Sequence, residues 1–261
     1  MSYALITGAS KGIGRAMAHE LARRKTDLLL VARSEAVLGE LAAALRQQYG
    51  VRVDFLATDL SLPGAAARVK QWCTEMNYPV STLVNNAGYG LWGRFDRLSL
   101  AEQRSLLQLN VQTLVELSHE MLSLLQAQPK AYILNVASTA AYQAVPTLSV
   151  YAASKAFVVV FTRGLRYELR RSNVSVSCLS PGATSTQFIE RAGMQAMQAT
   201  AAKFEMTSEV VARIGIDGML KGKAEIIPGL LNRITVRATY LLPKWLTEKL
   251  AANLYEKHLA P

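Results

Sequence analysis

The sequence predicts a doubly wound α/β sandwich built on a parallel β-sheet. Apolar runs with strand character alternate with amphipathic, helix-like stretches along most of the chain. The strand-like runs are continuously apolar, which is typical of parallel strands covered by helices on both faces. The composition agrees, because 51% of the 261 residues are hydrophobic and 18% are charged, a balance that favours a large core over disorder.

The predicted elements follow one another without an internal repeat or a linker. Strands are predicted at residues 3–7, 27–32, 51–57, 82–86, 131–137 and 174–180, with a short one at 225–228. The helical patterns between them cover residues 13–24, 35–49, 64–76, 101–127, 151–171 and 208–221. Right-handed crossovers then give a Rossmann-type sheet. We expect one domain, residues 1–261, with its chemistry in 1–190 and a lid and helical tail in 191–261.

The helix predicted from Tyr151 has almost no polar face, because residues 156–161 read Ala-Phe-Val-Val-Val-Phe. A helix that is apolar all round is buried on both sides. We therefore expect its outer side, with the neighbouring 101–127 helix, to be covered by a second subunit in a homodimer or homotetramer, or else by the tail.

The net charge of +10 raises the question of nucleic-acid binding. Arg23-Arg24 and Arg170-Arg171, however, each end a predicted helix, where cations offset the helix dipole, and no aromatic-basic interleaving occurs. An anionic small-molecule ligand is the preferred explanation, and no nucleic-acid partner is expected.

Targeting and metal signals are weak throughout the sequence. Cys73 and Cys178 form no disulfide framework and lie in no metal-ligand pattern, which favours a reducing compartment and predicts no metal site. Residues 1–8 lack the features of a signal peptide, and no apolar window reaches the length of a membrane span. We expect a cytoplasmic protein.

The segment Thr7-Gly8-Ala9-Ser10-Lys11-Gly12-Ile13-Gly14 follows the first strand and opens the first helix. Gly8 permits a sharp turn, Gly12 lets the backbone approach a pyrophosphate, and Gly14 allows close helix–strand packing. The exposed N–H groups of the helix start favour an anion. A plain glycine-rich turn is the alternative, but the strand–turn–helix context favours dinucleotide binding.

Three further features fall at the expected carboxyl edge of the sheet. Asn85-Asn86-Ala87-Gly88 ends the fourth strand, and Ser138 follows the fifth. Tyr151 and Lys155 lie one helical turn apart on the same face. A solvated helix face is the usual explanation for such a pair, but Tyr151 opens an otherwise apolar helix, so a cleft-facing role is preferred.

Together the segments TGASKGIG, NNAG and YAASK, with Asn110, Ser138 and Pro181-Gly182, resemble the short-chain dehydrogenase/reductase family over roughly residues 2 to 190. Among its members the chain looks like the ketoacyl/hydroxysteroid-type carbonyl reductases. The resemblance implies that Tyr151 is the acid/base and that Ser138 holds and polarises the substrate oxygen. Lys155 would favour the phenolate and bind the nicotinamide ribose. Asn110 would position a water between Lys155 and solvent.

The predicted cofactor is NADP(H). Ala32 stands where an NAD site commonly carries an acid, and Arg33 follows it, with Lys11 in the glycine loop. Two cations without a carboxylate suit a 2′-phosphate. The resemblance adds Asp59 as an adenine contact. The full cofactor set is Thr7, Gly8, Ser10, Lys11, Gly12, Ile13, Gly14, Arg33, Asp59, Leu60, Asn86, Ala87, Gly88, Tyr151, Lys155, Pro181, Gly182, Thr184 and Thr186.

The expected substrate is a lipophilic carbonyl or secondary alcohol, because the candidate pocket is mostly apolar. Beside Ser138 and Tyr151 it comprises Tyr89, Leu91, Trp92, Gln143, Val145, Pro146 and Phe188, with Met194 and Met197 in a lid or packed on the body. An NAD-dependent alcohol dehydrogenase and a non-catalytic NADP(H) sensor are the alternatives. The tail from Leu230 to Leu259 is expected to shape the substrate entrance and to pack on its own core, in preference to a neighbouring subunit or a membrane.

Overall fold

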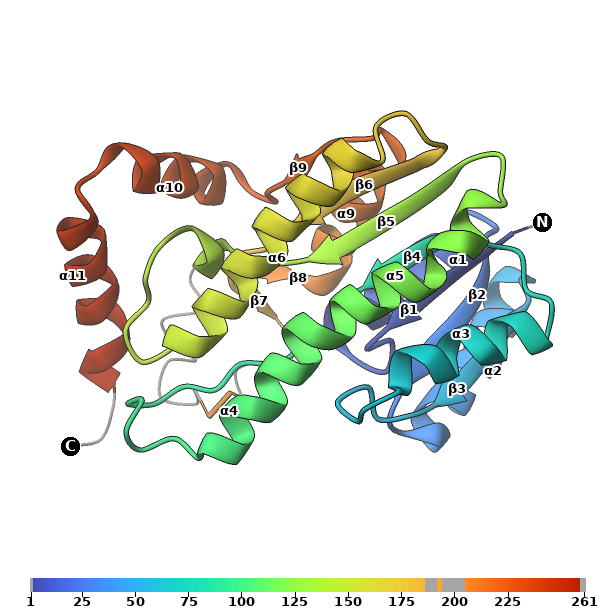
Figure 1. The fold of residues 1–261 in the computed structure, drawn as a ribbon, viewed down its shortest axis with the longest axis horizontal. Coiled ribbons are helices and arrows are strands. Elements are labelled where there is room, and N and C mark those ends of the chain that lie inside the picture. Colours follow the sequence, from blue (N-terminus) through green and yellow to red (C-terminus); the bar gives the residue numbers. More distant parts are fainter. Residues whose placement is uncertain (1, 186–191, 194–204, 259–261) are drawn as a thin grey trace.

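The predicted parallel sheet is present, with seven strands in the order β3-β2-β1-β4-β5-β6-β9 (Figure 1). The structure is a computed structural model that describes residues 2–185, 192–193 and 205–258. The chain order reverses between β1 and β4, which is where ligands bind in sheets of this kind. The strands are β1 (Tyr3–Thr7), β2 (Asp27–Ala32), β3 (Val53–Ala57), β4 (Val80–Asn85), β5 (Ala131–Val136), β6 (Val174–Leu179) and β9 (Glu225–Ile226).

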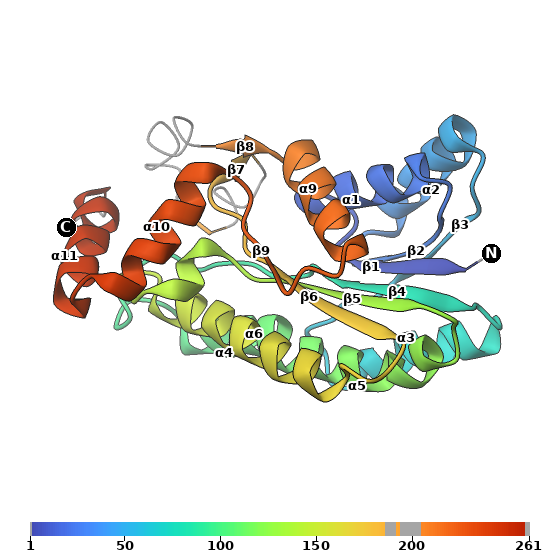
Figure 2. The ribbon, with the colours of Figure 1, turned by 90° about the horizontal axis from the view of Figure 1, so that it is seen from above.

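Helices cover both faces of the sheet, as Figure 2 shows from above. One face carries α1 (Gly12–Arg23), α2 (Glu35–Tyr49) and α9 (Ser208–Leu220). The other carries α3 (Ala65–Glu75), α4 (Leu100–Leu107), α5 (Thr113–Gln126) and α6 (Ser149–Glu168). The boundaries lie within a few residues of those predicted, except that the predicted 101–127 helix is α4 and α5 joined by a π-helical turn, η1 (Gln108–Gln112).

The sandwich has two hydrophobic cores, one on each face of the sheet, and they explain the continuous apolar runs of the sequence. Leu28 and Leu30 of β2 pack with α1 and α2, whereas Leu29 and Val31 belong to the core on the α3 and α5 side. All four are fully buried. Because burying one such side chain stabilises a fold by about 1.5–3 kcal/mol, each strand needs apolar residues at odd and even positions alike.

The tail departs from the alternating pattern, as predicted, and forms two helices, α10 (Leu230–Leu241) and α11 (Lys244–Tyr255). They are separated by Leu242 and Pro243, and Pro243 precedes the first residue of α11. Figures 1 and 2 place both helices at the end of the molecule toward which the arrowhead of β5 points. The tail therefore lies at the carboxyl edge of the sheet.

The alternative in which the tail covers the outer side of α6 is wrong, whereas cover by a second subunit stays a prediction. Val160 and Phe157 of α6 stay 71% and 40% exposed, so within the described residues neither α10 nor α11 covers this side of the helix. Within the described ranges, no helix is long and apolar enough to cross a membrane.

Two glycines make a matched test of the packing between α1 and the sheet. A Cβ on Gly14 would lie 2.3 Å from the Gly8 carbonyl oxygen, whereas a Cβ on Gly164, in the middle of α6, would meet nothing within 4 Å. We expect Gly14→Ala to lower the free energy of unfolding by about 3 kcal/mol because backbone must move. Gly164→Ala should raise it by about 0.8 kcal/mol through helix propensity. Urea unfolding followed by circular dichroism measures both, and equal effects would contradict this account of the loop.

Candidate active site

The glycine loop places α1 against the end of β1 with no side chain between them. Gly8 and Gly12 have φ of +65° and +52°, the left-handed region that favours glycine. Lys11 is the N-cap residue of α1, forms no side-chain cap, and is followed by no acidic residue in the first turn. The amide groups of this turn therefore face outward for an anion, and the loop fits the pyrophosphate of a dinucleotide.

Two predicted cofactor residues instead hold the loop onto β4. The Thr7 hydroxyl donates to the Val84 carbonyl (3.2 Å) and accepts from the backbone N–H groups of Asn86 and Ala87 (3.0 Å each). The Asn86 amide donates to the carbonyls of Thr7 (2.9 Å) and Gly8 (3.3 Å). Side chains at the ends of β1 and β4 thus fix the backbone of the proposed dinucleotide site.

The residues predicted around the adenosine half lie at the same edge. Lys11 and Arg33 are exposed, and within the described part of the chain neither side chain enters a salt bridge. Asp59 accepts hydrogen bonds from the Ser61 backbone (2.9 Å) and hydroxyl (2.7 Å), which shapes the turn after β3. Leu60 is buried, and its carbonyl accepts from Thr113 (2.6 Å). Ser10 lies half-buried in the glycine-loop turn, and Ile13 packs on the core beneath α1.

Asn110 lies in the π-helical turn and is 1% exposed. Its amide donates to the Tyr89 carbonyl (2.9 Å) and the Ser154 hydroxyl (3.1 Å), and its oxygen accepts from the Tyr89 backbone N–H (3.1 Å). A Cβ on Gly88 would lie 2.9 Å from that oxygen and 3.3 Å from Lys155 Nζ. Asn110 therefore ties the loop after β4 to α6, directly beside Lys155.

Tyr151, Lys155 and Ser138 come together as predicted. Tyr151 and Lys155 lie on the first turns of α6, with Lys155 Nζ 6.0 Å from the centre of the Tyr151 ring. Ser138 lies within reach of the Tyr151 phenol and acts to lower its pKa. Lys155 Nζ also donates to the Val136 carbonyl at the end of β5 (2.9 Å), which anchors it to the sheet.

Burial perturbs both titratable groups of this set. It raises the pKa of Tyr151 to about 12, although the Ser138 hydrogen bond acts in the opposite direction. It also lowers the pKa of Lys155 to about 8. Low polarity disfavours the charged form of each group, so the phenol stays protonated at neutral pH while the amine titrates close to it. Opposite perturbations of two neighbouring groups are typical of acid–base sites.

The backbone after β6 packs against the segment that follows Ser138 at the carboxyl edge of the sheet. The Pro181 carbonyl accepts from the Thr139 backbone N–H (2.9 Å). A Cβ on Gly182 would meet the Asn232 side chain at 2.6 Å, so the chain passes tightly against α10 here. Thr184, on the short strand β7 (Thr184–Ser185), donates to the Gly182 carbonyl. Thr186, Phe188, Met194 and Met197 lie outside the described residues.

An apolar wall surrounds Tyr151, made of predicted and unpredicted residues. Of the predicted pocket residues, Tyr89, Leu91, Trp92 and Val145 pack in the same cluster as Tyr151. Gln143 and Pro146 are half-buried nearby in sequence and are not members of the cluster. Seven other members of the cluster were not among the predicted pocket residues, namely Leu106, Ala140, Leu148, Val150, Ala152, Ala192 and Tyr255.

Tyr255 is the most unexpected of these additions. It is the last residue of α11, yet it packs with the wall around Tyr151 and raises the pKa of that phenol as a minor contribution. The contact joins residues far apart in sequence and follows no periodic pattern. Ser154, by contrast, could have been found, because it follows Tyr151 by three residues on the same helix and its hydroxyl donates to the Tyr151 carbonyl (2.7 Å).

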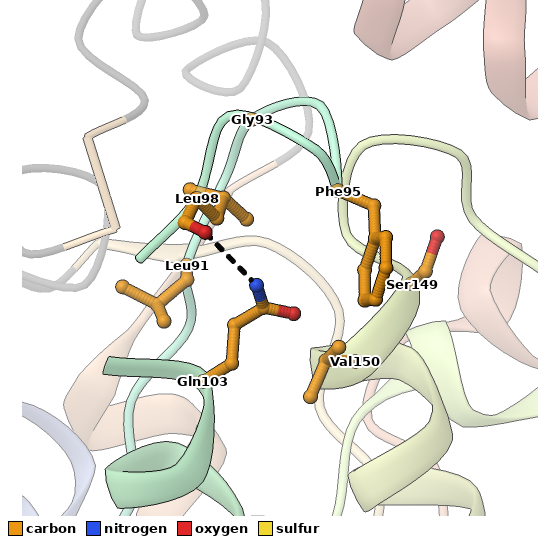
Figure 3. A pocket seen from close by; sticks show the side chains of 7 residues that line it. All are labelled: Leu91, Gly93, Phe95, Leu98, Gln103, Ser149 and Val150. Carbon is orange, nitrogen blue, oxygen red and sulfur yellow. Dashed lines mark hydrogen bonds between the residues drawn. The ribbon is translucent and has the colours of Figure 1, made fainter. Parts of the chain in front are cut away.

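A small pocket opens beside this wall (Figure 3). The Gln103 amide inside it donates to the Leu98 carbonyl (3.1 Å). The pocket shares Leu91 and Val150 with the wall but contains none of the predicted catalytic residues Asn110, Ser138, Tyr151 and Lys155. Its lining comprises Leu91, Gly93, Phe95, Leu98, Gln103, Ser149 and Val150. In the described ranges no cluster of histidine, cysteine and acidic side chains is placed to hold a metal ion.

Comparison with known proteins identifies the family to which the chain belongs. The family model for short chain dehydrogenases matches residues 2–227. The chain is 30% identical over 231 residues to a 7beta-hydroxysteroid dehydrogenase from Clostridium sardiniense, covering 88% of this chain and 87% of the relative.

Two solved structures are similar over nearly the whole chain. A short-chain dehydrogenase from Sphingobium yanoikuyae in complex with NADPH superimposes with a TM-score of 0.83 at 32% identity, covering 92% of each chain. A short-chain dehydrogenase/reductase from Burkholderia phymatum in complex with NAD gives 0.80 at 25% identity, covering 90% of this chain and 92% of the other. The two structures were solved with different nicotinamide dinucleotides.

Burial of Lys155 predicts a stability effect. The pKa of this amine is about 8 in the folded protein and 10.5 when unperturbed, so its charged form is disfavoured by folding. We expect Lys155→Met to raise the free energy of unfolding at pH 7 by about 2 kcal/mol, after allowing for the lost bond to Val136. Thermal or urea unfolding measures this difference.

The pH dependence provides the check on that stability effect. Between pH 8 and 10.5 the unfolded wild-type chain binds more protons at Lys155 than the folded one, so this residue makes stability rise with pH in that window. The advantage of Lys155→Met should therefore shrink as the pH rises through it. Lys221→Met, at an exposed position, serves as the control and should show neither effect. A Lys155→Met protein less stable than wild type at pH 7 would show that the ammonium is stabilising.

Proposed function

Because the chain belongs to the short chain dehydrogenase family, we propose that it is an NADP(H)-dependent oxidoreductase that interconverts a carbonyl and a secondary alcohol on a lipophilic small molecule. One observation carries the reaction type. Tyr151 lies within reach of Ser138 and one helical turn from Lys155, and an apolar wall surrounds it. Such a site can hold a carbonyl oxygen and exchange a proton with it.

The nicotinamide ring supplies or accepts the hydride when the cofactor is bound. Tyr151 donates its proton to the substrate oxygen during reduction, and a pKa of about 12 keeps that proton available at neutral pH. Ser138 holds the same oxygen. The Lys155 ammonium, close to the phenol ring, favours the phenolate that proton donation leaves behind. Oxidation of an alcohol uses the same groups in reverse, with the Tyr151 phenolate accepting the proton.

Asn110 has a positioning role in this proposal. Its amide donates hydrogen bonds to Tyr89 and Ser154 and lies beside Lys155. These contacts hold the loop after β4 in a fixed position relative to the Lys155 ammonium. A water held near Asn110 and linking Lys155 to solvent is compatible with this role.

Tyr151→Phe tests the assigned acid. The variant removes one hydroxyl from a buried ring, so we expect reduction of any ketone substrate to slow about 1000-fold, the scale of general acid catalysis. NADPH affinity, measured by fluorescence quenching, should change less than about twofold, because the ring and Lys155 remain. Ketone reduction by the Phe variant at the wild-type rate would show that another group supplies the proton.

Arg33 and Lys11 support NADP(H) as the preferred cofactor. Both are exposed cations at the edge where β1 and β2 end, and Ala32, the last residue of β2, leaves no carboxylate to bind a ribose 2′-hydroxyl. The NADPH complex of the Sphingobium yanoikuyae structure agrees with this choice, whereas the NAD complex of the Burkholderia phymatum structure keeps NAD as the second candidate.

The substitution Arg33→Asp distinguishes these cofactors. Losing a charge-assisted bond and gaining repulsion should weaken NADPH binding about 100-fold while leaving NADH binding nearly unchanged. Arg171→Asp, at an exposed position after α6, is the control for the change in net charge. Isothermal titration of the wild type and both variants with both cofactors measures the six affinities. If NADPH affinity is unaltered in Arg33→Asp, the 2′-phosphate contact belongs to Lys11.

The apolar wall supports a lipophilic substrate. Tyr89, Leu91, Trp92 and Val145 face the same cluster as Tyr151, and Tyr255 of the tail completes it. The relative from Clostridium sardiniense is named as a hydroxysteroid dehydrogenase, which agrees with a bulky apolar ketone. In this proposal α11 contributes to substrate selection and takes no part in holding the cofactor.

Two broader expectations belong to the same proposal. The exposed Val160 and Phe157 of α6 support a homodimer or homotetramer formed through α5 and α6, because such an apolar face is unusual on a monomer. Cys73 and Cys178 are buried and unpaired, which supports a reducing, cytoplasmic compartment.

A further inference from the structure

The outer face of the tail carries a row of exposed apolar side chains. On α10, Leu230, Leu231, Ile234 and Leu241 are 66%, 57%, 54% and 85% exposed. Large aliphatic side chains are seldom this accessible, and here four of them occur on one helix of twelve residues. Neither the proposed cofactor site nor the wall around Tyr151 uses them.

Helical geometry places these side chains together. Leu230, Ile234 and Leu241 are four and seven residues apart, so they form one stripe along α10. Val236 and Thr239, which are buried against the body, lie on the opposite side of the helix. The stripe therefore faces directly away from the protein.

The following helix carries further exposed apolar side chains. Trp245 and Leu250 of α11 are 65% and 56% exposed. Figures 1 and 2 show α10 and α11 as consecutive helices at one end of the molecule, outside the sandwich. We call Leu230, Leu231, Ile234, Leu241, Trp245 and Leu250 the tail surface.

The charges around the tail surface have one predominant sign. Residues 229–258 contain five lysines and arginines against two glutamates. Arg233, Arg237, Lys244 and Lys249 are all exposed and belong to the two helices that carry the apolar side chains. An apolar stripe flanked by cations and a tryptophan is typical of a helix that lies in the headgroup region of a membrane.

We propose that the tail surface docks on an anionic lipid surface, with α10 lying along the membrane. The apolar side chains would enter the acyl boundary, while the arginines and lysines reach the phosphate groups. The charge pattern favours this occupant over a second copy of the chain, because self-association would bring the cations of both copies together. The proposal is independent of turnover, since no residue of the tail surface belongs to the catalytic set.

Flotation of the full chain with lipid vesicles tests the proposal. One set of vesicles is phosphatidylcholine alone, and in the other about a third of the lipid is phosphatidylglycerol. We expect binding to the anionic vesicles that weakens as salt is added. Arg233→Gln/Arg237→Gln should weaken it roughly 30-fold by removing two cations. Ile234→Ser/Leu241→Ser should weaken it about tenfold or more by removing buried apolar area.

Matched control variants distinguish docking through the tail surface from nonspecific binding to vesicles. Arg171→Gln/Lys223→Gln makes the same change in net charge at exposed positions outside the tail, and Leu62→Ser/Leu100→Ser removes two leucines that are 59% and 60% exposed. Both should bind as wild type does. Brominated lipid should quench Trp245 fluorescence, and Trp245→Phe should lose that quenching while Trp72 and Trp92 remain.

Three results would overturn the proposal. One is the absence of vesicle binding, and another is an equal loss of binding in the control variants. The third comes from sedimentation velocity without lipid, where a smaller assembly for Ile234→Ser/Leu241→Ser than for wild type would show that a second copy covers the tail surface.

Discussion

The catalytic edge of this protein depends on one side-chain amide inside a helix. Asn110 binds both backbone groups of Tyr89 and the Ser154 hydroxyl, and is almost completely buried. It therefore connects the loop after β4, the α4–α5 stack and α6 through hydrogen bonds of fixed orientation. Lys155 Nζ lies in the space that this connection defines, beside Gly88.

The apolar surroundings of Tyr151 and Lys155 have two opposing effects. An apolar surrounding suits a lipophilic ligand, but it disfavours the charged forms of both groups, as their perturbed pKa values show. The sheet compensates in part, because the Val136 carbonyl accepts a hydrogen bond from Lys155. Under the proposed function, the site is thus arranged for proton transfer at the expense of stability, a balance that is common where enzymes carry out their chemistry.

Much of this architecture could be predicted from the sequence, because local rules apply to it. Apolar runs such as Leu28 to Val31 indicate a sheet covered on both faces, and the glycine spacing of residues 8–14 indicates the loop. The contact of Tyr255 with the wall around Tyr151 could not be predicted, because it links distant segments with no shared pattern. The π-helical turn was also missed, since apolar periodicity does not resolve one additional residue within a helix.

The π-helical turn limits which deletions the gene can accept in this segment. A π-helical turn holds one residue more than an α-helix needs, and each residue of a helix advances the chain by about 100°. Deleting a single residue between Gln108 and Gln112 would restore regular helix, but it would rotate α4 relative to α5 and carry Asn110 away from Tyr89 and Ser154. Homologues that keep the amide should therefore keep the length of this segment, even where the surrounding residues are freely exchanged.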